Sequence, residues 1–151
     1  IKSVSFEKTE FAELPLKFEA GTANYVGAAS MGAAIKYLEK IGFEDIERHE
    51  TELLEYATHK LLAVDGIKII GFTKNKISVI SFLLENIHHY DTGVILDKLG
   101  IAVRTGTHCA EPAMKHFGID GTVRASFALY NTKDDIDKLY DGLLRVQNMF
   151  R

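Results

Sequence analysis

Two runs of β-branched residues in the middle of the chain constrain its fold more than any other feature. They are GIKIIGF at 66–72 and ISVISFLL at 77–84, with the polar stretch TKNK between them at 73–76. β-Branched residues favour strands, and a short polar connection between two such runs predicts a β-hairpin. The fold is therefore expected to contain strands that are at least partly antiparallel.

Helical segments surround this hairpin. A helix rich in small side chains is predicted over 24–41, a second over 43–63, and a third after Thr132, its predicted N-cap. The shorter elements are two extended segments within 2–18, helices at 91–99 (capped by Asp91 or Thr92) and 110–118, and strands at 101–104 and 122–130. We therefore predict an α+β fold, with helices packed on one face of a small, largely antiparallel sheet.

Composition and charge exclude several classes of protein. The 151 residues suffice for one domain with a hydrophobic core, and the net charge is -3. Lysine and arginine are scattered, so no basic patch predicts nucleic-acid binding. No apolar run approaches the ~18–20 residues that cross a bilayer, and no secretory signal opens the chain. A single cysteine excludes an internal disulfide and fits a reducing compartment, so we expect a cytoplasmic protein.

Two further patterns are better explained by structure than by ligand binding. GAASMG at 27–32 has the glycine spacing of a phosphate loop, but Ala33 and Ala34 follow where lysine and serine or threonine are required. Helix packing explains these glycines better. The six histidines form no metal-ligand motif, and His88 and His89, as neighbours on an extended segment, are expected on opposite faces. We therefore predict no metal site.

The segment RTGTHCAEP at 104–112 contains the single cysteine, Cys109. Lone cysteines are usually buried as small apolar residues, but the small and polar neighbours here do not predict burial. A free thiol is only a few per cent thiolate at neutral pH, and a nearby cation or helix N-terminus increases that fraction. Arg104, His108 and a helix beginning near Pro112 are candidates for this role. These residues alone leave open whether Cys109 is a nucleophile or an idle thiol.

Two arginines have similar surroundings, each after a valine and before small residues. Arg104 ends one predicted strand, and Arg124 lies near the start of another. A guanidinium group binds a carboxylate through two parallel hydrogen bonds, a geometry that lysine lacks. Taken singly, either arginine is better explained by a surface ion pair.

Four segments carry a resemblance that covers essentially the whole chain. They are FEAGT at 18–22, HHYD at 88–91, GIAVRTGTHCAEP at 100–112 and VRASFALYNT at 123–132. In order and spacing they resemble the C-terminal part of the SufS-type cysteine desulfurases and selenocysteine lyases, which are pyridoxal-phosphate enzymes of the class V aminotransferase group. The sequence departs from the family's pattern at Thr107, where a histidine is common.

The resemblance implies a role for each matching residue. Cys109 corresponds to the nucleophile, which attacks the sulfur of a cysteine substrate held by pyridoxal phosphate, so that a persulfide forms and alanine is released. Arg124 corresponds to the residue that binds the substrate carboxylate, and Arg104 to a second active-site arginine near the cysteine loop. Thr22 corresponds to a threonine that reaches the cofactor phosphate of the neighbouring subunit in a homodimer. The short loop around Cys109 implies sulfur transfer to an acceptor protein of the SufE or SufU kind, for iron–sulfur cluster assembly.

The resemblance also implies that the cofactor lysine belongs to a large domain upstream of residue 1. Residues 1–17 are then expected to be an extended segment at the junction with that domain, and 18–151 the C-terminal small domain. Without the lysine, the chain by itself is expected to be inactive. L-Cysteine and L-selenocysteine both remain possible substrates.

Two alternatives also remain open. One is another class V enzyme that does not need Cys109, such as an epimerase or a kynureninase-like lyase. The other is a non-catalytic α+β module that binds a partner or a small carboxylate.

Overall fold

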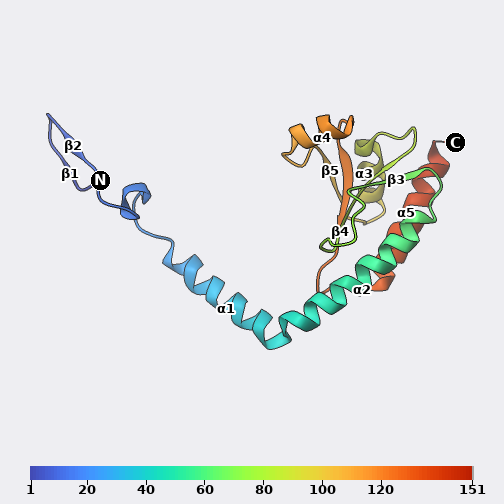
Figure 1. Ribbon diagram of the computed structural model, residues 1–151, viewed down its shortest axis with the longest axis horizontal. Coiled ribbons are helices and arrows are strands. Elements are labelled where there is room, and N and C mark those ends of the chain that lie inside the picture. Colours follow the sequence, from blue (N-terminus) through green and yellow to red (C-terminus); the bar gives the residue numbers. More distant parts are fainter. Residues whose placement is uncertain (151) are drawn as a thin grey trace. The chain divides into compact units, whose positions relative to one another are not determined.

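The computed structural model describes residues 1–150, which form two compact units, one over residues 1–42 and one from residue 43 onward. The elements of the first unit are β1 (Ser3–Val4), β2 (Thr9–Glu10), a 3₁₀ turn at Leu16–Phe18 and α1 (Tyr25–Ile41) (Figure 1). Strands β1 and β2 pair antiparallel. The Asn24 side chain caps α1 by accepting a hydrogen bond from the Gly27 backbone N–H at 2.9 Å.

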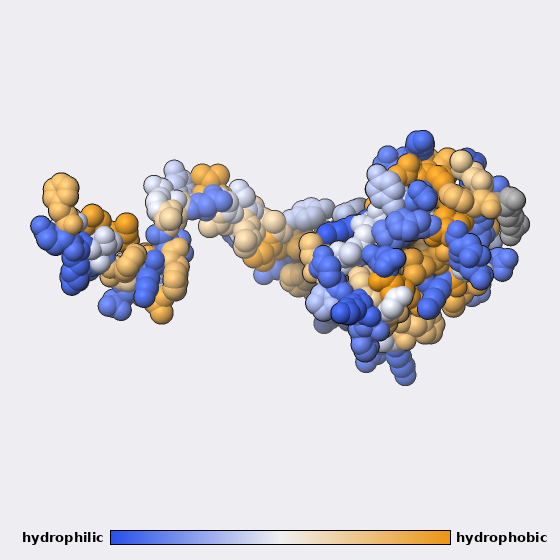
Figure 2. Space-filling view, turned by 90° about the horizontal axis from the view of Figure 1, so that it is seen from above, coloured by the Kyte–Doolittle hydropathy of each residue, from blue (hydrophilic) through white to orange (hydrophobic). Residues whose placement is uncertain are grey.

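No side chain of the first unit is buried. Apolar side chains therefore lie open along it (Figure 2), among them Phe6, Phe11, Phe18 and Tyr37. The division predicted at residues 17 and 18 stays a prediction.

The second unit combines helices with an antiparallel sheet. Its elements are α2 (Phe43–Leu62), β3 (Ile67–Ile70), β4 (Val79–Leu84), α3 (His89–Lys98), β5 (Arg104–Gly106), α4 (Glu111–Phe117), β6 (Thr122–Ser126) and α5 (Lys133–Met149). The strand order is β3-β4-β6-β5, and every neighbouring pair is antiparallel. The predicted α+β class and the hairpin β3–β4 are confirmed.

The core of the second unit lies between this sheet and the helices α2, α3 and α5 (Figure 1). Alternate residues of β4 are buried, as expected for a strand with one face against helices. Phe82 of β4, Leu61 of α2 and Leu143 of α5 are all fully buried. Burial of such side chains contributes about 1.5–3 kcal/mol each to folding. None of the described helices is long and apolar enough to cross a bilayer.

The strand predicted over 101–104 is wrong, because β5 begins where that strand was expected to end. The Ile101 backbone N–H donates to the Leu96 carbonyl of α3 at 2.9 Å, and Gly100 has a φ of 77°. The chain after α3 therefore completes a helix C-cap before it reaches the sheet. Pairing with β6 starts at Arg104 as a result.

The N-cap predicted for α3 is also wrong. The helix begins at His89, and His88 is its cap, since the His88 side chain accepts a hydrogen bond from the Tyr90 backbone N–H at 3.3 Å. The predicted strand over 122–130 ends at Ser126. The predicted N-cap of α5, Thr132, is confirmed: the Asp135 carboxylate accepts its backbone N–H at 3.0 Å.

Candidate active site

The β5–β6 pair brings the two candidate arginines together. In the antiparallel register, Arg104 lies directly opposite Arg124, so both side chains leave the same face of the sheet. Arg104 is exposed and Arg124 half-buried. None of the salt bridges formed within residues 1–150 includes either arginine. Like charges at directly opposite positions destabilise a sheet, and an anion bound between the two arginines would offset their repulsion.

The loop that follows β5 presents Cys109. Thr107 to Ala110 form a tight turn, closed by a hydrogen bond from the Ala110 backbone N–H to the Thr107 carbonyl at 3.0 Å. Its two central residues, His108 and Cys109, have φ values of 58° and 57°. Left-handed backbone at a non-glycine residue costs about 1–3 kcal/mol, so the surrounding contacts must hold this turn in place. Thr107 supplies one such contact, since its hydroxyl donates to the Glu111 carboxylate at 3.0 Å.

Cys109 is exposed, and its sulfur meets Arg104. The Nη2 atom of Arg104 lies 3.8 Å from Sγ of Cys109. The positive charge of Arg104 is therefore placed beside the sulfur. The expected exposure of Cys109 is therefore observed, and one of the three expected activating groups contacts the sulfur.

His108, the second expected cation, has a different environment. Its Nε2 atom lies 2.8 Å from the Thr122 hydroxyl of β6. Burial, followed by the charge of Arg124, lowers the pKa of His108 from its ordinary value of 6.5. The lowered pKa disfavours the cationic form of the ring, and the role of His108 as a cation beside Cys109 stays a prediction. Sequence reasoning missed Thr122 altogether, because no local signal marks a partner fourteen residues further on.

His89 lies close to Gly121, the residue immediately before β6. A Cβ atom added at Gly121 would come within 2.5 Å of its Nε2 atom and 2.9 Å of the Gly106 backbone. Burial lowers the pKa of His89, and the neighbouring His88 lowers it further. The expectation that these two histidines occupy opposite faces is wrong: their ring centroids are 4.2 Å apart, because the pair begins a helix. Within residues 1–150, no group of histidine, cysteine or acidic side chains is arranged to hold a metal ion.

The fourth candidate, Thr22, belongs to the first unit. It is exposed and follows Gly21, which has a φ of 74°. The cluster in the second unit consists of Arg104, Cys109 and Arg124.

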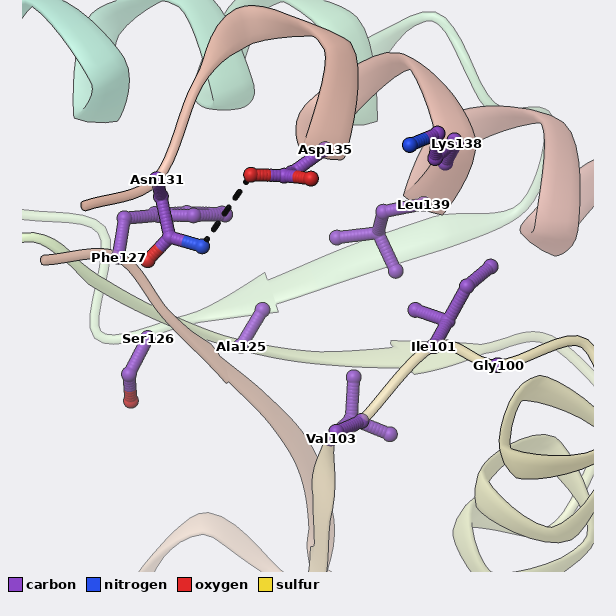
Figure 3. A pocket seen from close by; sticks show the side chains of 11 residues that line it. Gly100, Ile101, Val103, Ala125, Ser126, Phe127, Asn131, Asp135, Lys138 and Leu139 are labelled. Carbon is purple, nitrogen blue, oxygen red and sulfur yellow. Dashed lines mark hydrogen bonds between the residues drawn. The ribbon is translucent and has the colours of Figure 1, made fainter.

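A separate cavity of about 230 Å³ lies on the helix side of the sheet. It is lined by Ile101 and Val103, by residues 125–127 of β6 and its continuation, and by α5. Figure 3 shows Ala125 pointing toward Leu139 of α5, whereas Ser126 points away. Since side chains alternate along a strand, Arg124 leaves the opposite face from Ala125. This cavity is therefore not part of the cluster around Cys109.

Comparison with known proteins identifies the family. A family model described as aminotransferase class-V matches residues 1–139. The chain therefore belongs to the class V aminotransferase family.

Several relatives that match nearly the whole chain are named probable cysteine desulfurases. The chain is 44% identical over 149 residues to a probable cysteine desulfurase of Xylella fastidiosa and 48% identical over 152 residues to one of Streptomyces coelicolor. Each match covers 99% of this chain and 36% of the relative, so the chain spans little more than a third of their length.

Solved structures agree with this assignment. The apo cysteine desulfurase of Thermococcus onnurineus matches 98% of this chain and 38% of its own, with a TM-score of 0.84 and 38% identity. The cysteine desulfurase CsdA of Escherichia coli, in an S-sulfonic acid form, matches 97% of this chain and 36% of its own, with a TM-score of 0.85 and 34% identity. The predicted class V aminotransferase family and the predicted α+β fold are confirmed.

Proposed function

We propose that this chain is the C-terminal part of a pyridoxal-phosphate-dependent cysteine desulfurase of the SufS type. The parent enzyme converts L-cysteine to L-alanine and retains the sulfur as a persulfide on Cys109. The observation that carries this proposal is the 3.8 Å contact between Nη2 of Arg104 and the exposed Sγ of Cys109. A thiol held at the surface beside a cation suits a nucleophile better than a packing residue.

Arg124 is proposed to bind the carboxylate of the substrate. Its Nε atom is buried and has no hydrogen-bond partner among residues 1–150. A buried donor without a partner is costly, and a carboxylate ligand would remove that cost through two parallel hydrogen bonds. The nearby Arg104 adds a second positive charge on the same face. Both features support an anionic substrate such as an amino acid.

In the proposed reaction, Sγ of Cys109 forms a bond with the sulfur of the substrate as the bond between that sulfur and the substrate's Cβ breaks. The electron pair of the broken bond stays with the carbon, which is then protonated to give alanine. Pyridoxal phosphate, when bound, supplies the electron sink that this cleavage needs. The unpaired Nε of Arg124 and the cationic face around it fit an amino acid bound next to that cofactor. Thr22 is proposed to donate a hydrogen bond from its hydroxyl to the cofactor phosphate of the neighbouring subunit in a homodimer.

The sulfur is proposed to leave Cys109 for an acceptor protein of the SufE or SufU kind, for iron–sulfur cluster assembly. The exposure of Cys109 supports direct transfer, since an acceptor thiolate has to reach the persulfide sulfur. A free reactive thiol of this kind fits the reducing cytoplasm, which we propose as the site of action.

The test uses the full-length parent loaded with cofactor. Cys109→Ser should abolish alanine formation from L-cysteine and leave the absorbance band of the cofactor intact. Arg124→Lys should lower kcat/KM by about 10–100-fold, because a single ammonium cannot form the paired contact. Arg48→Lys is the matched control, since Arg48 is exposed and pairs with Asp45 on α2, and its activity should be unchanged.

Undiminished alanine formation by Cys109→Ser would refute the nucleophile assignment and favour a class V enzyme that does not need this thiol. The same assay with L-selenocysteine determines which of the two substrates the parent prefers.

A further inference from the structure

The turn that carries Cys109 cannot be held by its own backbone preferences. His108 and Cys109 both have left-handed φ values, 58° and 57°, although neither is glycine. One backbone hydrogen bond closes the turn, and the Thr107 hydroxyl donates a second hydrogen bond to Glu111 of α4. Relaxation of the two strained residues would move the sulfur, so a contact between the turn and the sheet is needed to hold them.

The ring of His108 makes that contact. Its Nε2 atom lies 2.8 Å from the Thr122 hydroxyl, and Thr122 is only 1% exposed. Thr122 lies two residues before Arg124 on β6, so the two side chains leave the same face of the strand. His108 therefore ties the cysteine loop to the strand that carries the proposed carboxylate-binding arginine.

The Thr122 end of the contact is rigid. Thr122 pairs with Gly106 in the β5–β6 register, and β6 lies between β4 and β5 in the sheet. A buried hydroxyl needs a hydrogen-bond partner, and the ring of His108 supplies it for Thr122 at 2.8 Å. A hydrogen bond to such a fixed group orients a loop better than one to a mobile side chain.

We propose that His108 is a positioning residue: its hydrogen bond to Thr122 pins the left-handed turn so that Cys109 Sγ stays beside Arg104 on the face that also carries Arg124. The proposal rests on the proposed function, in which Cys109 is the nucleophile. His108 itself need not touch substrate or exchange a proton. The alternative is that the contact only stabilises the fold.

A double-mutant cycle on the 151-residue chain separates these two roles. Cys109 is the single cysteine, so the rate of alkylation by iodoacetamide reports on that sulfur alone. Thr122→Val removes the hydroxyl at nearly constant volume, and Arg104→Gln removes the charge that the sulfur is held against. If the hydrogen bond acts through Arg104, Thr122→Val should slow alkylation at neutral pH about 3–10-fold, but less than about 2-fold in the Arg104→Gln background.

Two further variants complete the design. Thr122→Ser retains the hydroxyl and should restore the rate, and Thr73→Val is the matched control. Thr73 also makes one hydrogen bond through its hydroxyl, 3.1 Å to the Asn75 carbonyl, but it lies in the exposed β3–β4 connection. Thermal melting of each variant checks that it is folded. If Thr122→Val does not fold, His108→Phe removes the same hydrogen bond from the partly exposed loop side, and the same cycle is run with it.

The proposal is overturned if Thr122→Val slows alkylation by the same factor with and without Arg104, or if it has no effect on the rate. The experiment uses neither substrate nor cofactor, so its outcome is independent of the alanine assay. A positive cycle together with undiminished alanine formation by Cys109→Ser would refute the proposed function and leave the positioning role intact. A negative cycle together with an inactive Cys109→Ser would refute the positioning role of His108 and leave the proposed function intact.

Discussion

Gly121 is the position at which a single added methyl group should disturb the candidate site most directly. It lies immediately before β6, is buried, and has no left-handed φ, so alanine meets no left-handed strain there. The obstacle is steric. The new Cβ would lie 2.9 Å from the carbonyl carbon and oxygen of Gly106 and 2.5 Å from Nε2 of His89.

The expected cost follows from what has to move. The His89 ring is a side chain, but the Gly106 atoms are backbone at the point where β5 pairs with β6. To reach ordinary van der Waals separation, β5 must move by roughly half an ångström, which strains its pairing with Thr122. Over-packing of this kind costs about 1–3 kcal/mol, and the backbone obstacle places Gly121→Ala near the upper end. At about 4 °C per kcal/mol, the melting temperature should fall by roughly 8–12 °C.

The assay is thermal unfolding followed by far-UV circular dichroism, with Gly32→Ala as the matched control. A Cβ added at Gly32, in the middle of α1, meets no atom within 4 Å, and alanine favours a helix by about 0.5–1 kcal/mol over glycine. Gly32→Ala should therefore not lower the melting temperature. A Gly121→Ala variant that melts with the wild type would refute the close packing of β6, His89 and the cysteine loop.

Three further predictions concern stability. Leu143→Ala should lower the free energy of unfolding by about 2–5 kcal/mol in urea titrations, whereas Leu62→Ala, at a side chain that is 55% exposed, should cost far less; equal losses would contradict the assigned core. Asp135→Ala removes the carboxylate that accepts the Thr132 backbone N–H and should cost about 1 kcal/mol in the same titrations, and no loss would count against the cap. Burial lowers the pKa of His89 from 6.5, so that as the pH falls the unfolded chain takes up a proton before the folded chain does. The stability that His89 contributes is therefore present above pH 6.5, and the melting temperature should fall as the pH drops toward the lowered pKa. If the melting temperature of His89→Asn falls as steeply, the loss of stability comes from another group.

Much of the fold follows from local signals in the sequence. The β-branched runs on either side of TKNK predict β3 and β4, and the capping residues of α5 are visible in the sequence as well. The strand at 101–104 was wrong because Gly100, with a φ of 77°, and Ile101 complete the C-terminal cap of α3. The hydrogen bond from Ile101 to Leu96 belongs to this cap, and a linear pattern cannot display it.

The candidate site, like the fold, is predicted only in part by the sequence. The family resemblance predicts that Arg104, Cys109 and Arg124 belong to one site, whereas their residue types alone left this open. The sequence does not predict that the ring of His108 turns to Thr122, since that contact depends on the β5–β6 register. Nor does it predict that burial and Arg124 lower the pKa of His108, because both causes arise only when the sheet has formed.

The most direct test of the central claim follows the sulfur itself. The full-length parent, loaded with cofactor, is incubated with L-cysteine, the thiols are alkylated, and the peptide that contains Cys109 is analysed by mass spectrometry. If Cys109 is the nucleophile, this peptide should carry one additional sulfur atom, which a reductant removes. Accumulation of alanine while Cys109 carries no additional sulfur would contradict the account.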